Sequence, residues 1–432
     1  MARGGVSVGG GWTAWSAWLA ASLFYLYEYF VRVAPCVMES NLRDAFDASA
    51  SALGLASGLY YVVYGPLQIA IGPIYDHFGY RKPFYVASLL VFAGCFLAAS
   101  PLDGMGSFAV GRALMGAGSA FAFIGTMYVA SVWFPRRRWA YISGLTTALG
   151  MGGALLGQGP VAKLVQLVGW RNCWLVAGAI GVAVTFLLRW ALPPEPTDLR
   201  EKLIGGNFRS GVGRFLSHLA GVLRNRQTWL AGIIGCALFM PLTVFADFWG
   251  VHYIGLLTGA TAAKAAAANG MLYVGWLFGS PLAGHLSDRA GRRKPFLIGS
   301  CACSLALLVL ILSSEHIPLH MFAFLLFMLG LMSSPEVICF TVSGEHNSKN
   351  AQGTAIAAVN TIVMLFGGIM QPVVGLILDH CAVRGHGAAT TYTLSHFRMA
   401  FTVLPVAMAL GLVMAIFMEE SGEKHCRAKR LS

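Results

Sequence analysis

Residues 72–84 have the sequence GPIYDHFGYRKPF, and residues 284–296 have the sequence GHLSDRAGRRKPF. Gly, Asp, Gly, Arg, Lys, Pro and Phe recur in the same register in both stretches. Each copy is a short polar segment between two long apolar runs, as expected for a hairpin between two helices. The match predicts that the chain consists of two similar halves.

The composition indicates a membrane protein. Of 432 residues, 57% are hydrophobic and 11% are charged, whereas a soluble domain carries about 25% charged residues. Twelve spans of about 20 residues would use roughly 240 residues, and lipid requires each span to be helical. We therefore predict an all-α membrane protein with two pseudo-symmetric six-helix bundles. The predicted spans are 13–37, 51–74, 84–101, 107–133, 139–163, 171–192, 229–254, 264–286, 296–314, 317–341, 353–379 and 397–418.

The distribution of basic residues predicts the topology. The net charge is +12, but the Lys and Arg residues cluster in short loops between apolar runs, which argues against a nucleic-acid partner. If the amino terminus is cytoplasmic, 21 of the 30 Lys and Arg residues fall in inner segments and 6 in outer segments. This asymmetry follows the positive-inside rule and predicts that both termini are cytoplasmic.

The chain is predicted to have four parts. Residues 1–192 form an amino-terminal bundle, 193–228 a cytoplasmic linker, 229–418 a carboxy-terminal bundle and 419–432 a basic cytoplasmic tail. The linker opens with three prolines within residues 193–196, which stop the sixth helix. Alternating arginines and apolar residues after it predict an amphipathic helix on the inner leaflet.

The spacing G-x-x-x-D-x-x-G-x-[RK]-[RK] resembles the signature loop of the major facilitator superfamily. The first copy departs from it at His77 and Tyr80, where the family usually has basic residues. Shorter motifs, including Gly169-Trp170-Arg171 and Gln371-Pro372, are similar to the bacterial phagosomal-transporter branch and to the lysosomal dipeptide carrier of animals. That branch imports amino acids or related nutrients. The resemblance implies gating roles for Gly72, Asp76, Gly79, Arg81, Lys82, Gly284, Asp288, Gly291, Arg293 and Lys294.

By the same resemblance, Asp76 should meet the start of the eleventh span near Gly353, and Asp288 the start of the fifth near Ser143. A carboxylate is favourable at a helix amino terminus. Such contacts would exist only while the cytoplasmic side is closed, so each would act as a latch on one state. The alternative is that both are solvated loop charges.

Glu28 and Arg32 are four residues apart on the first span and so share a helix face. An unpaired charge there costs at least about 2.5–3.5 kcal/mol, so they should pair or face a water-filled cavity. One hypothesis is that Arg32 attracts a substrate carboxylate while Glu28 binds its amine or a coupled proton. The other is a structural salt bridge.

Other polar groups inside spans are also candidates for substrate binding. The resemblance places Arg112 on the central pathway, although pairing with a carbonyl or Glu28 is an alternative. Asp247 could bind a proton or amine, or could lie at the outer mouth and cap the next segment of the chain. Glu336 is a weaker candidate and could serve only as a gate or surface group. The full predicted substrate-binding set is Glu28, Arg32, Tyr60, Tyr64, Gln68, Arg112, Tyr128, Asp247, Tyr273, Trp276, Asn360 and Gln371.

Missing motifs narrow the function. The sequence has no phosphate-binding GxxxxGK[ST], no HExxH and no paired Cys/His framework, so we expect no ATP drive, metal, cofactor or enzyme activity. We predict a monomeric, multi-pass secondary transporter of the inner membrane. Its cargo would be an amino acid, short peptide or organic acid, with protons as a candidate coupling ion. Alternatives are efflux of drugs or lipophilic cations, and a nutrient sensor with a transporter fold.

Overall fold

The computed structural model describes residues 11–101, 104–135, 138–195, 208–382 and 392–421. Within these residues the chain is helical and has no β-strand. Among the described residues, eight helical segments are long and apolar enough to cross a membrane, judged by length and composition. Part of the predicted linker, residues 196–207, and the tail beyond residue 421 lie outside the described residues.

The first half forms one helical bundle. Its elements are α1 (Trp12–Val33), η1 (Ala34–Val37), α2 (Glu39–Phe46), α3 (Ala50–Phe78), α4 (Arg81–Ala99), α5 (Gly104–Ser119), α6 (Ala122–Trp133), α7 (Trp139–Gly157), α8 (Gly159–Val168) and α9 (Trp170–Ala191).

The second half follows α11 (Phe208–Arg224), which lies within the predicted linker. Its elements are α12 (Arg226–Met240), η3 (Pro241–Trp249), α13 (Gly250–Thr258), α14 (Ala262–Ala290), α15 (Lys294–Ser313), α16 (Leu319–Ser333), η4 (Ser334–Glu336), α17 (Val337–Glu345), η5 (Lys349–Ala351), α18 (Gln352–Cys381), α19 (Leu394–Ala400) and α20 (Val403–Phe417).

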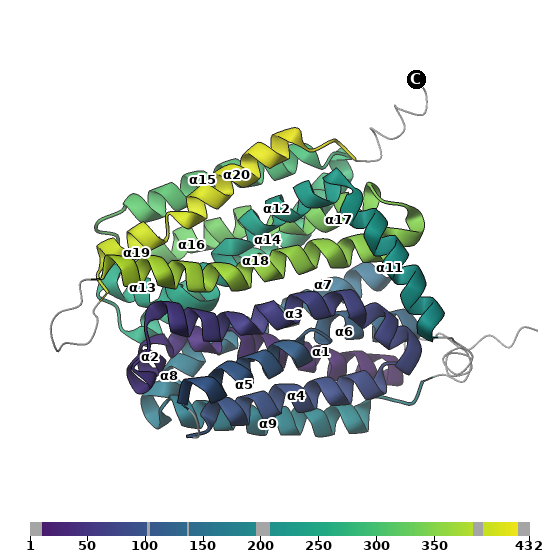
Figure 1. Cartoon of the computed structure of the whole chain (residues 1–432), viewed down its shortest axis with the longest axis horizontal. Coiled ribbons are helices and arrows are strands. Elements are labelled where there is room, and N and C mark those ends of the chain that lie inside the picture. The colour runs from purple at the N-terminus through teal and green to yellow at the C-terminus, as the bar shows by residue number, and fades with distance from the viewer. Residues whose placement is uncertain (1–10, 102–103, 136–137, 196–207, 383–391, 422–432) are drawn as a thin grey trace, which may run out of the picture.

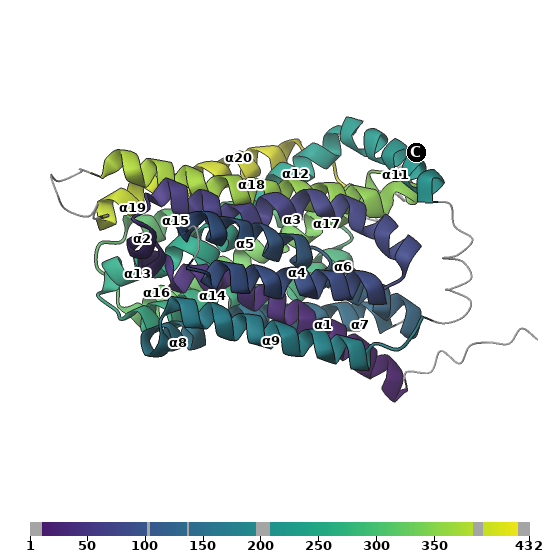
Figure 2. The same ribbon diagram turned by 60° about the horizontal axis from the view of Figure 1, so that its bottom comes forward.

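The two bundles lie side by side, with α3 of the first against α18 of the second (Figures 1 and 2). Helices α7 and α8 of the first half also contact α14 of the second, and η1 contacts η3. We call the end of the molecule that carries the two hairpins, residues 79–80 and 291–293, the hairpin end, and the other the far end. Helix α11 crosses the hairpin end and packs against α3, α12 and α18.

Prolines interrupt several of the predicted spans. Spans 139–163, 229–254 and 317–341 were expected to be continuous, but the chain leaves α-helical geometry before Pro160, at Pro241 and around Pro335. Proline lacks an N–H and its ring clashes with the preceding turn, so the α-helical hydrogen-bond pattern breaks there. The resulting π and 3-10 turns place side chains near the middle of the molecule that a regular helix would direct elsewhere.

The two hairpins share two features. Gly79 and Gly291 adopt positive φ angles of 72° and 65°, which explains the repeated glycine. A carboxylate from the segment that follows the last helix of the same half, α9 or α20, then binds the start of the next helix. Glu195 Oε1 accepts from the Arg81 N–H at 3.1 Å, and Glu420 Oε1 accepts from the Arg293 N–H at 2.6 Å. Each hairpin is therefore held by its own half.

The halves touch through backbone at the far end. A Cβ added to Gly54 would lie 2.8 Å from the Gln371 carbonyl oxygen, and one added to Gly58 would lie 2.4 Å from that of Gly368. Small residues allow helices to approach this closely within a membrane. The Asp379 carboxylate of α18 also accepts from the Ala50 N–H, at 3.0 Å, and from the adjoining Ser51 N–H, so it caps α3.

The halves are separated at the hairpin end. A Cβ added to Gly72 of α3 or to Gly353 of α18 would meet nothing within 4 Å. The same holds for Gly144 of α7 and Gly284 of α14. Helices that touch through bare backbone at the far end thus diverge toward the hairpins.

Because α3 is tightly packed against α18 at Gly58 but open at Gly72, a glycine-to-alanine substitution should affect stability in opposite directions at the two positions. Gly58→Ala should destabilise the protein by about 1–3 kcal/mol, because the new methyl group overpacks the contact with α18. Gly72→Ala should be neutral or stabilising by up to about 1 kcal/mol, because alanine favours helix and the site is open. Thermal unfolding of both purified variants in one detergent checks this, and equal melting temperatures would contradict the tight contact.

Candidate functional site

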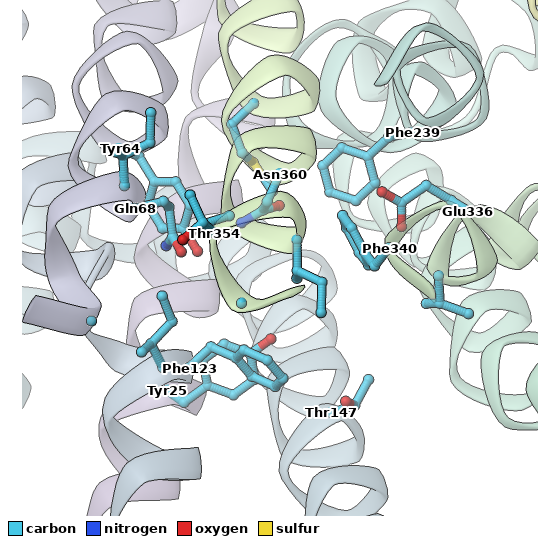
Figure 3. A pocket seen from close by; sticks show the side chains of 18 of the residues that line it. Tyr25, Tyr64, Gln68, Phe123, Thr147, Phe239, Glu336, Phe340, Thr354 and Asn360 are labelled. Carbon is cyan, nitrogen blue, oxygen red and sulfur yellow. The ribbon is translucent and has the colours of Figure 1, made fainter. Parts of the chain in front are cut away.

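A cavity of about 820 Å³ lies between the halves. Its lining extends from Arg32 and Trp276 to Asp76 and Gly353 at the hairpin end. Figure 3 shows aromatic and polar side chains from both halves facing it. The cavity therefore occupies the space that the divergence of α3 from α18 creates.

Arg32 and Glu28 form a buried ion pair. Arg32 Nη2 donates to both Glu28 oxygens, at 3.0 and 3.1 Å, and the two side chains are 1% and 0% exposed. Tyr60 donates to Glu28 at 2.7 Å, and the Arg32 guanidinium carbon lies 4.2 Å from the ring centroid of Tyr29. Arg32 lines the cavity, whereas Glu28 is not among the lining residues. The pair therefore presents its cationic member to the cavity.

Arg112 has the structural role that was left open as an alternative. Its guanidinium donates to the carbonyls of Val31, at 3.2 Å, and Arg32, at 3.3 Å. The Val31 carbonyl would be bonded in a continuing α-helix by the N–H of residue 35, but that residue is Pro35. Arg112 supplies the missing donor. It does not line the cavity, although the resemblance had placed it on the central pathway.

The cavity brings together part of the predicted substrate-binding set. Among its lining residues are Arg32, Tyr64, Gln68, Trp276 and Asn360. The predicted residues outside the lining are Glu28, Tyr60, Arg112, Tyr128, Asp247, Tyr273 and Gln371. Most of these are buried and hydrogen-bonded within the protein, and the ring of Tyr128 stacks on that of Tyr75.

The sequence profile described as Major Facilitator Superfamily matches residues 12–372. The chain belongs to this superfamily. The predicted resemblance at that level is confirmed, and the protein is a membrane transporter with the superfamily's all-helical fold rather than an enzyme. The resemblance to the phagosomal branch stays a prediction.

Relatives within the superfamily are distant. The chain is 25% identical to a probable sulfoacetate transporter of Cupriavidus necator, over 63% of this chain and 64% of that protein. It is 23% identical to a quinolone resistance transporter of Acinetobacter baumannii, over 91% of each chain. Among solved structures, a bacterial homologue of the human lysosomal transporter Spinster superimposes with a TM-score of 0.73 at 15% identity. The match covers 95% of this chain and 97% of that one.

Asp247 connects the halves outside the cavity. It lies in the π-helical turn η3, is 4% exposed, and accepts from Tyr273 at 2.5 Å and from Tyr61 of the first half. Beside it, Asn269 donates to Gln158, also across the halves, at 3.1 Å. Asp247 thus belongs to a polar contact between the bundles and lies outside the cavity lining.

The two predicted latch contacts are not formed in this arrangement. Asp76 lines the cavity and forms no hydrogen bond or ion pair within the described part of the chain. Asp288 pairs within its own hairpin, with Arg293 at 2.6 Å. The remaining gating candidates lie at the hairpin end as expected from the repeat. Their gating role stays a prediction about the state in which this end is closed.

Sequence reasoning missed several residues. Glu195 and Glu420 were not recognised as hairpin caps, because nothing local to them signals which helix they contact. The cap that Asp379 forms on α3 was also missed, although a carboxylate at the end of a span could have suggested a helix cap. Glu336 was ranked low, yet it lines the cavity. Among the described residues, no group of three or more His, Cys, Asp or Glu could hold a metal ion.

The buried ion pair predicts strong coupling between its members. Glu28→Gln should destabilise the protein by about 3–5 kcal/mol, because it leaves the Arg32 charge buried without its counter-ion. Adding Arg32→Gln should recover part of that loss, since two neutral side chains need no charge compensation. Thermal unfolding of the single and double variants measures this, and strictly additive effects of the two substitutions would contradict the pairing.

Proposed function

We propose that this superfamily member is a secondary transporter that moves a small polar or zwitterionic metabolite by alternating access. The observation that carries the proposal is the inter-half cavity, which has a buried arginine in its lining and is bounded by separated helices at one end only. Amino acids, short peptides and organic acids are the proposed substrate classes. We also propose that transport of the substrate is coupled to the movement of protons.

We further propose twelve spans with both termini in the cytoplasm of the cell and the protein in the inner membrane. The hairpin end would then face the cytoplasm, and the present arrangement would be open inward. Closing the hairpin end would bring Gly72 toward Gly353 and Gly144 toward Gly284, while the far end opens. Such rocking of two repeats about a central site is how transporters with internal repeats work.

The lining supports a polar cargo. Besides Arg32, the lining includes the polar residues Gln68, Asn360, Thr354 and Glu336. Polar groups in a membrane interior are expensive and mark substrate pathways. The relative named as a probable sulfoacetate transporter supports the organic-acid class.

Efflux of drugs or lipophilic cations is the second candidate. The relative named as a quinolone resistance transporter matches over most of both chains, and the rings of Tyr25, Phe123, Phe239 and Phe340 line the cavity. An aromatic lining can bind large apolar cations. The two candidate functions therefore predict uptake of different compounds into proteoliposomes that contain the purified protein.

Uptake into proteoliposomes tests the proposed function. The panel holds amino acids, dipeptides and dicarboxylic acids, with ethidium as the lipophilic cation, each with and without an imposed pH gradient. We expect uptake of at least one polar metabolite, reduced by Arg32→Gln and unchanged by Glu315→Gln, which removes an exposed charge outside the cavity. Transport of ethidium with no uptake of any polar compound would replace this proposal with the efflux function.

The latch hypothesis predicts a transport defect without loss of protein. Asp76→Asn should lower uptake several-fold, because the state with a closed hairpin end loses the charge that would meet the start of α18. The amount of variant in the membrane should equal that of the unaltered protein by immunoblot. Uptake that stays at the unaltered rate would remove the latch.

A further inference from the structure

Glu336 reaches the cavity because a proline interrupts its helix. The predicted span 317–341 divides into α16 and α17 at the 3-10 turn η4, where Pro335 precedes Glu336. The side chain is 2% exposed. In Figure 3 its carboxylate lies beside the ring of Phe239, with Phe340 nearby, on the opposite side of the view from Tyr64 and Gln68.

The Glu336 carboxylate lacks a partner within the described part of the chain. Its Oε1 atom is buried without a hydrogen bond, and no ion pair to it is formed there. A buried carboxylate without compensation is costly. A substrate that pairs with the Glu336 carboxylate only while it is bound would account for the absence of a partner in this arrangement.

The charges in the cavity favour a cation at this point. The charge of Arg32 is already balanced by Glu28 at 3.0 Å, so the pair is neutral overall. Glu28 was the predicted amine-binding group, but it is engaged by Arg32 and Tyr60 and is absent from the lining. Glu336 is then the acidic side chain of the lining that lies away from the hairpin-end mouth marked by Asp76.

Aromatic rings complete the chemistry of a cation site. Phe239 and Trp276 both line the cavity and pack edge to face, with ring centroids 5.4 Å apart. Phe340 lines the cavity from α17, one turn after Glu336. Ring faces attract an ammonium group, and a carboxylate adds a charge-assisted hydrogen bond.

We propose that Glu336, together with the rings of Phe239 and Phe340, binds an organic ammonium group of the transported substrate. This inference rests on the proposed transport function and narrows its substrate class to amine-bearing compounds. Arg32 receives the carboxylate of a zwitterion, using guanidinium donors beyond those that bind Glu28. The two ends of the substrate are thus recognised by opposite halves of the protein.

A matched set of three probes tests the amine site. The purified full-length protein is titrated with phenethylamine, L-phenylalanine and 3-phenylpropanoate, which carry the ammonium alone, both charges and the carboxylate alone. Glu336→Gln should weaken phenethylamine and L-phenylalanine binding about tenfold or more, the loss expected for a charge-assisted hydrogen bond, and should leave 3-phenylpropanoate unaffected. Glu336→Asp should retain part of the amine affinity, and Glu315→Gln all of it.

A second variant guards against a folding defect. Phe239→Leu keeps the carboxylate and should weaken phenethylamine more than 3-phenylpropanoate. The inference is overturned if phenethylamine does not bind the unaltered protein, or if it binds the Glu336→Gln variant equally well. An equal loss of affinity for all three probes in that variant would also overturn it, and would indicate a proton site. Uptake of an organic acid without any amine dependence would overturn the amine site alone and leave the transport function standing.

Discussion

A methyl group has no room at Gly58, because its carbon would lie 2.4 Å from the carbonyl oxygen of Gly368. This contact between bare helix backbones, repeated at Gly54, sets the shape of the molecule. It holds α3 and α18 together at the far end, and Asp379 adds a cap to the start of α3. Because both helices are long and diverge from this contact, their other ends leave space between the halves. The cavity is that space, so its position depends on where the glycines lie.

Much of the architecture was predictable from the chain. The repeated stretch at 72–84 and 284–296 predicted two related halves, and the Gly79 and Gly291 angles explain why the repeat retains its glycines. The pairing of Glu28 with Arg32 followed from their four-residue spacing and from the cost of a lone charge in lipid. These inferences succeeded because each depends on neighbours along one helix or on a comparison of the two halves.

The rest depends on contacts between distant segments. Arg112 could have been assigned to the carbonyl that Pro35 leaves without a donor, but only if α1 and α5 were known to be neighbours. The role of Asp247 requires Tyr61 from the other half and a π-helical turn that sequence periodicity does not reveal. Glu336 was undervalued for a similar reason. Its direction is set by the turn at Pro335, and an apolar run does not show which face of a broken helix meets a cavity.

The hairpin caps bear on how such a molecule can be inhibited. Glu195 and Glu420 each bind the hairpin of their own half, so these bonds survive any rotation of one bundle relative to the other. In the proposed rocking motion each bundle moves as a unit, and the contacts that change lie between the two bundles. A compound that wedges between α3 and α18, or between α7 and α14, would arrest the cycle without unfolding either bundle.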